Sequence, residues 1–161
     1  MSTALPTRPR QVGVGVKRVF PLVASQFNAA YVQGLVNHAT EELRALAPNA
    51  AVTLHLVPGA FEIPVLVREL ALQKKADAIL ALGVILKGDT SHAEHLATSV
   101  TNALQQIAIE YGVPVINAVL SLENEEQAQE RCHGKQINRG IEAARAAIQI
   151  ANAMTEVRPN Q

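Results

Sequence analysis

The chain has 161 residues, of which 48% are hydrophobic and 17% charged, and its 14 basic and 14 acidic residues give a formal net charge of zero. This balance provides no basic surface for nucleic acid or anionic membranes, and an aromatic content of 3% disfavours stacking on single-stranded nucleic acid. The single cysteine, Cys132, excludes an intramolecular disulfide and suits a reducing compartment, so we expect a cytoplasmic protein.

The first 16 residues are predicted to form an arm, because Pro6, Pro9, scattered charges and a Val-Gly repeat are typical of a terminus outside regular structure. We find no pattern of a signal peptide, and no apolar run reaches the roughly 18 residues that span a membrane. We therefore expect one α/β domain over residues 17–156, with an arm at 1–16 and a short tail at 157–161.

Four short apolar runs predict β-strands. They are VFPLVAS (19–25), AVTLHLV (51–57), AILALGVIL (78–86) and VPVINAVL (113–120). The third run is apolar on both faces, which is typical of a central strand in a parallel sheet. The second run places Thr53 and His55 on one face, which suits a strand nearer the edge.

Apolar stripes at helical spacing lie between these runs and in the last part of the chain. Ser91 with Glu94, and Asn124 with Gln127, fit the capping-box pattern that begins a helix. Strands that alternate with helices predict a three-layer α/β fold, in which helices flank both faces of a four-stranded parallel sheet.

Ligands of such sheets bind beyond the carboxyl ends of the strands. The candidate segments are therefore SQFN (25–28), VPGAFEIP (57–64), LKGDTSH (86–92) and NAVLSLEN (117–124). In the third segment, Lys87, Gly88, Thr90 and a predicted helix start supply the parts of an anion site, and His92 suits proton transfer near neutral pH. The glycine-rich motifs of ATP-binding and dinucleotide-binding loops are absent from the sequence.

Three candidate side chains also have an ordinary structural explanation. Phe27 could stack on a planar ligand or belong to the core. Glu62 could bind a polyol or a heterocycle, or simply favour the first turn of a helix. Arg131 could clamp a phosphate, or it could pair with Glu126 or Glu130.

A metal site is not expected. His92 and His95 stand one helical turn apart, but a zinc site needs a third protein ligand, and the sequence places none beside them. A metal-dependent hydrolase that uses this pair is the alternative, which metal analysis would detect.

The motifs FN (27–28), VPGAFEIP (57–64), LGVILKGDTSH (82–92) and LENEEQAQER (122–131) together resemble the lumazine synthase family of riboflavin biosynthesis. The resemblance implies a flavodoxin-like sandwich and the condensation of 5-amino-6-(D-ribitylamino)uracil with 3,4-dihydroxy-2-butanone 4-phosphate. The products would be 6,7-dimethyl-8-ribityllumazine, phosphate and water, without metal or organic cofactor. A non-catalytic flavin- or lumazine-binding protein on the same scaffold is the alternative.

The resemblance also implies a homo-oligomer with shared active sites: a pentamer, a decamer or a sixty-subunit shell. It makes His92 the proton-transfer residue. It assigns the ribitylaminouracil to Phe27, Asn28, Ala60, Phe61, Glu62, Val84, Ile85, Leu86 and Asn117, of which Asn117 would act in a neighbour's site. It assigns the butanone phosphate to Lys87, Gly88, Asp89, Thr90, Arg131 and Arg139. Asn117 stands where the family commonly has Phe, and Arg139 where many members have Lys.

Overall fold

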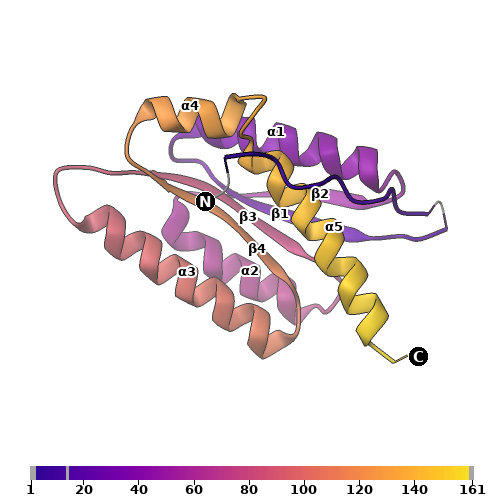
Figure 1. The fold of residues 1–161 in the computed structure, drawn as a ribbon. Coiled ribbons are helices and arrows are strands. Elements are labelled where there is room, and N and C mark those ends of the chain that lie inside the picture. Colours follow the sequence, from indigo (N-terminus) through magenta and orange to yellow (C-terminus); the bar gives the residue numbers. More distant parts are fainter. Residues whose placement is uncertain (1–2, 14, 160–161) are drawn as a thin grey trace.

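Four parallel strands form the central layer of the protein, in the order β2-β1-β3-β4 (Figure 1). The computed structural model describes residues 3–13 and 15–159. The strands are β1 (Val19–Ser25), β2 (Ala51–Val57), β3 (Ile79–Leu86) and β4 (Val115–Leu122). Because β1 pairs with both β2 and β3, the edge position predicted for β2 and the central position predicted for β3 are confirmed.

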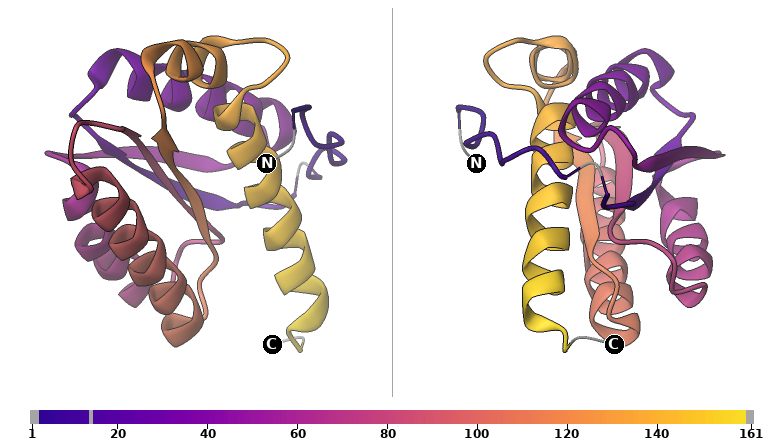
Figure 2. Two further views of the ribbon diagram at one scale, coloured as in Figure 1. Left: turned by 60° about the vertical axis from the view of Figure 1, so that its left-hand side comes forward. Right: turned by 90° about the vertical axis from the view of Figure 1, so that its right-hand side faces the viewer.

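In the part of the chain that the structure describes, five α-helices cover the two faces of this sheet: α1 (Ala29–Leu46), α2 (Ile63–Leu72), α3 (His92–Tyr111), α4 (Glu125–His133) and α5 (Arg139–Val157). Helices α1, α4 and α5 pack on one face, and α2 and α3 on the other (Figures 1 and 2). The predicted three-layer α/β fold is therefore confirmed. Among the described residues, no helix has the length and apolar character that crossing a membrane requires.

Strand β3 explains why the sheet needs helices on both sides. Leu80 and Leu82 are buried against the layer of α1, α4 and α5, whereas Ile79 and Ala81 are buried against α2 and α3. An apolar run with alternate side chains on opposite faces is stable only when both faces are covered. The continuous apolar pattern of this run therefore explains why β3 lies in the interior of the sheet, between β1 and β4.

The fourth strand begins and ends two residues later than predicted, at Val115 and Leu122 instead of 113 and 120. Pro114 has no N–H to donate to the ladder, although its carbonyl accepts a bond from Ile79 N (2.9 Å). At the other end, the polar Ser121 does not stop the strand, since its side chain faces solvent while Leu122 is buried. Edge strands tolerate this alternation.

The capping box predicted at Asn124 is present at the start of α4. Asn124 Oδ1 accepts a hydrogen bond from Gln127 N (2.9 Å), and Gln127 Oε1 accepts one from Glu123 N (3.0 Å). The return bond therefore reaches one residue earlier than in the standard box. This cap fixes where the chain turns from the end of β4 into the helix that carries Arg131.

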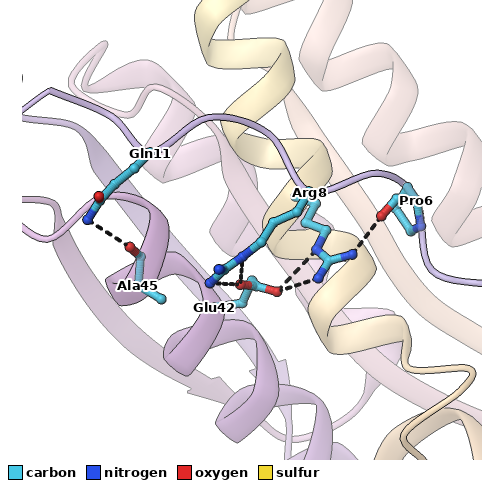
Figure 3. Close-up of polar contacts among 6 residues, drawn as sticks. Pro6, Arg8, Gln11, Glu42 and Ala45 are labelled. Atoms are coloured by element: carbon cyan, nitrogen blue, oxygen red, sulfur yellow. Dashed lines mark hydrogen bonds and ion pairs between the residues drawn. The ribbon is translucent and has the colours of Figure 1, made fainter.

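The N-terminal arm lies against α1 and α5 without forming a helix or strand over its described residues (Figure 3). Glu42 of α1, 8% exposed, accepts hydrogen bonds from Arg8 Nη2 (2.8 Å) and from Arg145 Nε of α5 (3.1 Å). Arg145 Nη1 also donates to the carbonyl of Pro6 (2.6 Å). Because a buried carboxylate requires paired donors, these contacts dock a segment that the sequence indicated only as an unpacked arm.

Candidate active site

A pocket of about 360 Å³ lies where the strand order of the sheet reverses. From β1 the chain crosses to β2 on one side and then to β3 on the other side of β1. Ligands of open parallel sheets bind at such a switch point, beyond the carboxyl ends of the strands. The predicted site residues that line this pocket are Phe27, Ala60, Phe61, Val84, Ile85, Leu86 and His92.

Phe27 stands at the mouth of the pocket. Hydrogen bonds from Gln26 N to Val57 O (2.8 Å) and from Phe27 N to Pro58 O (3.1 Å) continue the pairing of the chain past the end of β1. The Phe27 side chain is nevertheless 73% exposed, so the alternative that it belongs to the core is wrong. An exposed aromatic ring held on a paired backbone is a suitable platform for a planar ligand.

Asn28 joins the end of β1 to β3. Its backbone is left-handed (φ 59°), a conformation that Asn tolerates better than most residues. Its Nδ2 donates a hydrogen bond of 2.7 Å to the carbonyl of Val84. The amide that the resemblance assigned to substrate is thus engaged with the backbone of β3, and it holds two walls of the pocket together.

His92 is the first residue of α3, and its exposed side chain lines the pocket. The capping box predicted for Ser91 is wrong: Ser91 has nearly helical dihedral angles (φ −73°, ψ 3°) and makes no side-chain cap bond. An extended conformation is what lets a cap residue reach the helical N–H groups. Thr90 Oγ1 instead accepts from His92 N (3.3 Å), so a threonine fixes the start of the helix.

The loop before His92 continues the β3–β4 ladder through a hydrogen bond from Lys87 N to Leu122 O (2.9 Å). Lys87 Nζ lies 3.2 Å from a Glu123 carboxylate oxygen, and both side chains are exposed. Gly88, Asp89 and Thr90 are exposed as well. The loop leads directly to His92, which lines the pocket. Residues 87–90 themselves are not part of the pocket lining.

Glu62 ends the short 3-10 helix η1 (Ala60–Glu62) and precedes α2. The Glu62 side chain is half-buried, between the buried Ala60 and the exposed Phe61 of the same turn. Ala60 and Phe61 line the pocket, whereas Glu62 stands next to it.

Asn117 was expected at a strand exit, and this expectation is wrong, because Asn117 is the third residue of β4. Its side chain is exposed, and its amide has partners in its own chain. Nδ2 donates to Thr101 Oγ1 (3.3 Å), and Oδ1 accepts from Val119 N (3.1 Å). Asn117 does not line the pocket of the same chain.

The two predicted phosphate-binding arginines also lie outside this pocket. Arg131, on α4, pairs with Glu130 at 3.5 Å, which is one of the two partners that its sequence position suggested. Arg139, the first residue of α5, is 5% exposed and forms an ion pair with Glu142. Within one chain, six of the nine pyrimidine-binding candidates therefore line the pocket with His92, namely Phe27, Ala60, Phe61, Val84, Ile85 and Leu86, whereas both arginines lie in the helix layer on the other face of the sheet.

Ser25 belongs to the candidate segment SQFN, but the sequence indicated no role for it; it is the last residue of β1 and lines the pocket although it is only 3% exposed. The parallel register that pairs Ala24 with Leu82 places Ser25 beside Gly83 of β3. A signal was present, because Ser25 is the one hydroxyl in the apolar run VFPLVAS and alternates onto the face of Val23.

A second hollow, of about 760 Å³, lies at the amino ends of the strands and does not match a catalytic centre. Its two cationic side chains are engaged with the backbone: Lys74 donates to the carbonyl of Tyr111 (3.3 Å), and Arg158 donates to the carbonyl of Gly112 (2.8 Å). Burial raises the pKa of the Cys132 thiol to about 12, which leaves it protonated and unreactive. Among the described residues, no three His, Cys, Asp or Glu side chains are grouped as a metal site requires.

Comparison with known protein families gives one match over most of the chain. The family model described as 6,7-dimethyl-8-ribityllumazine synthase matches residues 18–155 of the 161-residue sequence. The matched segment begins one residue before β1 and ends within α5, so it contains the whole sheet and every residue of the pocket.

Proposed function

The chain belongs to the 6,7-dimethyl-8-ribityllumazine synthase family, a transferase family of riboflavin biosynthesis, and on this basis we propose its substrates and the roles of its residues. The proposed reaction condenses 5-amino-6-(D-ribitylamino)uracil with 3,4-dihydroxy-2-butanone 4-phosphate. It yields 6,7-dimethyl-8-ribityllumazine, phosphate and water. The observation that carries the proposal is the pocket at the sheet's switch point, with Phe27 and His92 at its wall, inside the matched segment.

The chemistry needs several proton transfers and one departing anion. One pyrimidine nitrogen attacks the ketone and water leaves, and phosphate leaves from the butanone as a carbon-bound proton is removed. The second nitrogen then attacks the carbonyl so formed, a second water leaves, and the ring closes. His92 moves these protons, since an imidazole exchanges protons readily near neutral pH.

The remaining roles follow from position. Phe27 stacks on the pyrimidine ring at the pocket mouth, and residues 60–62 of η1 contact the ribityl chain. The backbone of residues 84–86 faces the heterocycle. The loop 87–90 and the N-terminus of α3 stabilise the departing phosphate through backbone N–H groups and the helix dipole. Holding both reactants in one orientation removes part of the entropic barrier.

A turnover assay tests this proposal and separates it from the non-catalytic alternative. The purified chain is incubated with both substrates, and lumazine is quantified by liquid chromatography against the spontaneous reaction. The proposal predicts a rate above background that is proportional to protein concentration. A protein that binds the lumazine but leaves the background rate unchanged would be a binding protein.

We further propose that Asn117 and Arg131 act in the pocket of a neighbouring subunit, because neither lines the pocket of its own chain. For Arg139, only the resemblance supports a phosphate contact, since its side chain is buried and paired with Glu142. The proposal therefore requires an oligomer, and dissociated but folded subunits should be inactive.

A subunit-mixing experiment tests the shared site. Asn117→Trp and His92→Ala proteins, each impaired but intact as an oligomer, are dissociated, mixed and reassembled. Mixed oligomers contain some interfaces with an unaltered Asn117 and an unaltered His92, so activity should rise above that of either parent. Mixed oligomers confirmed by mass spectrometry that show no such rise would place both residues in one subunit's site.

A further inference from the structure

Ser25 is the buried polar side chain at the inner end of the pocket. The mouth is formed by exposed groups, Phe27, Phe61 and His92, whereas Ser25 is 3% exposed and lies with the buried Ile85 and Ala93. Among the described residues that line the pocket, only Ser25 and His92 carry polar side chains. No hydrogen bond joins the Ser25 hydroxyl to another described residue, and its oxygen is not one of the fully enclosed unpaired polar atoms of that part of the chain, so it is open to a ligand in the pocket.

Gly83 leaves space beside this hydroxyl. It is the neighbour of Ser25 across the β1–β3 pairing, and a Cβ placed on it would lie 3.1 Å from Ser25 Oγ. The same Cβ would lie 3.4 Å from Ile63 Cδ1 and from Val119 Cγ1. Any larger residue at position 83 would thus crowd the hydroxyl, so the glycine keeps the Ser25 side chain unobstructed behind the pocket lining.

The apolar surroundings of Ser25 select which part of the substrate enters. A ribityl chain carries several hydroxyl groups, and burying them against Ile85 and Ala93 would leave most of them without hydrogen bonds. A pyrimidinedione ring has apolar faces and a polar edge of alternating carbonyl and N–H groups. A serine hydroxyl can both donate and accept, so it matches such an edge.

We infer that the Ser25 hydroxyl binds the polar edge of the pyrimidinedione ring and thereby sets the orientation of the heterocycle beneath Phe27. This inference rests on the proposed function and assigns Ser25 as a specificity-determining residue for the pyrimidine substrate. The butanone phosphate, at the loop beside His92, makes no contact with Ser25.

The test compares Ser25→Ala with Ser99→Ala, a control that removes an exposed hydroxyl from α3 outside the pocket and outside the candidate segments. The dissociation constant of the ribitylaminouracil is measured by titration calorimetry, and steady-state kinetics give KM for each substrate. Ser25→Ala should raise the dissociation constant and KM of the pyrimidine about three- to tenfold, which is the range for one neutral hydrogen bond. The KM of the butanone phosphate should be unchanged, and Ser99→Ala should behave as wild type.

Analogues that lack one or the other ring carbonyl oxygen identify the contact. If the hydroxyl donates to a ring carbonyl, wild type and Ser25→Ala should bind one of the two analogues equally, because the partner of the hydroxyl is gone. An effect that persists with both analogues would assign the bond to a ring N–H, and equal binding of the unmodified pyrimidine by Ser25→Ala and wild type would overturn the inference. Absence of turnover in the wild type, with the Ser25→Ala binding effect intact, would instead refute the proposed function alone.

Discussion

Substitution of Asn28 tests whether this residue positions the pocket walls, as the structure indicates. Asn28→Gly keeps the left-handed backbone without strain but removes the 2.7 Å hydrogen bond to Val84 O. The loss of that bond should lower the free energy of unfolding by about 1 kcal/mol. Asn28→Ala loses the same bond and keeps a Cβ in the left-handed region without the polar side chain that lets Asn tolerate it, so it should be about 1–2 kcal/mol less stable than Asn28→Gly.

The assay is urea unfolding of both variants and wild type at one protein concentration, because oligomer stability depends on concentration. The expected order of stability is wild type, then Asn28→Gly, then Asn28→Ala. Equal destabilisation by Gly and Ala would show that the φ of 59° carries no strain and would refute the backbone part of the reasoning. Kinetics add a second readout. A positioning role predicts that Asn28→Gly lowers kcat along with pyrimidine affinity, whereas loss of a substrate bond alone would mainly raise KM.

Three further predictions concern single side chains. His92→Ala should lower kcat about ten- to a hundredfold while pyrimidine binding remains, and unchanged kcat across neutral pH would remove His92 from the mechanism. Arg131→Ala should raise the KM of the butanone phosphate about tenfold to a hundredfold, the effect of losing a charge-assisted bond, with little change for the pyrimidine; equal weakening of both substrates would indicate a structural role. Cys132, whose burial raises its pKa to about 12, should resist alkylation in the native protein at pH 8 and react once the protein is unfolded, as mass spectrometry can show.

The fold was predictable because its signals are local. An apolar run such as ILALGVIL has buried residues on both faces, and only a central strand satisfies that pattern. The end of β4 was harder to predict, since a polar residue such as Ser121 is compatible both with a strand edge and with a loop. The cap of α3 was missed for a similar reason: Ser91 and Thr90 are both suitable residues, and their backbone angles decide between them.

The site was predictable only where the sheet itself brings residues together. The rule for strand ends correctly placed Phe27, Leu86 and His92 around one pocket, whereas Val84 and Ile85 were indicated only by the family resemblance. It could not show that the Asn28 amide is directed at Val84, or that Ser25 and Gly83 are neighbours, because those facts depend on the register between β1 and β3. Whether Asn117 and Arg131 act in a neighbour's pocket depends on contacts between subunits, which no pattern within one chain encodes.

A crystal structure of the protein with 6,7-dimethyl-8-ribityllumazine bound tests the central claim most directly. The account predicts the ring system in the pocket between β1 and β3, with Phe27 against its face and Ser25 Oγ within hydrogen-bond distance of its polar edge. His92 should stand beside the newly formed ring, and the ribityl chain should extend along residues 60–62. A lumazine bound in the hollow of Lys74 and Arg158 at the opposite end of the sheet, with this pocket empty, would contradict the account.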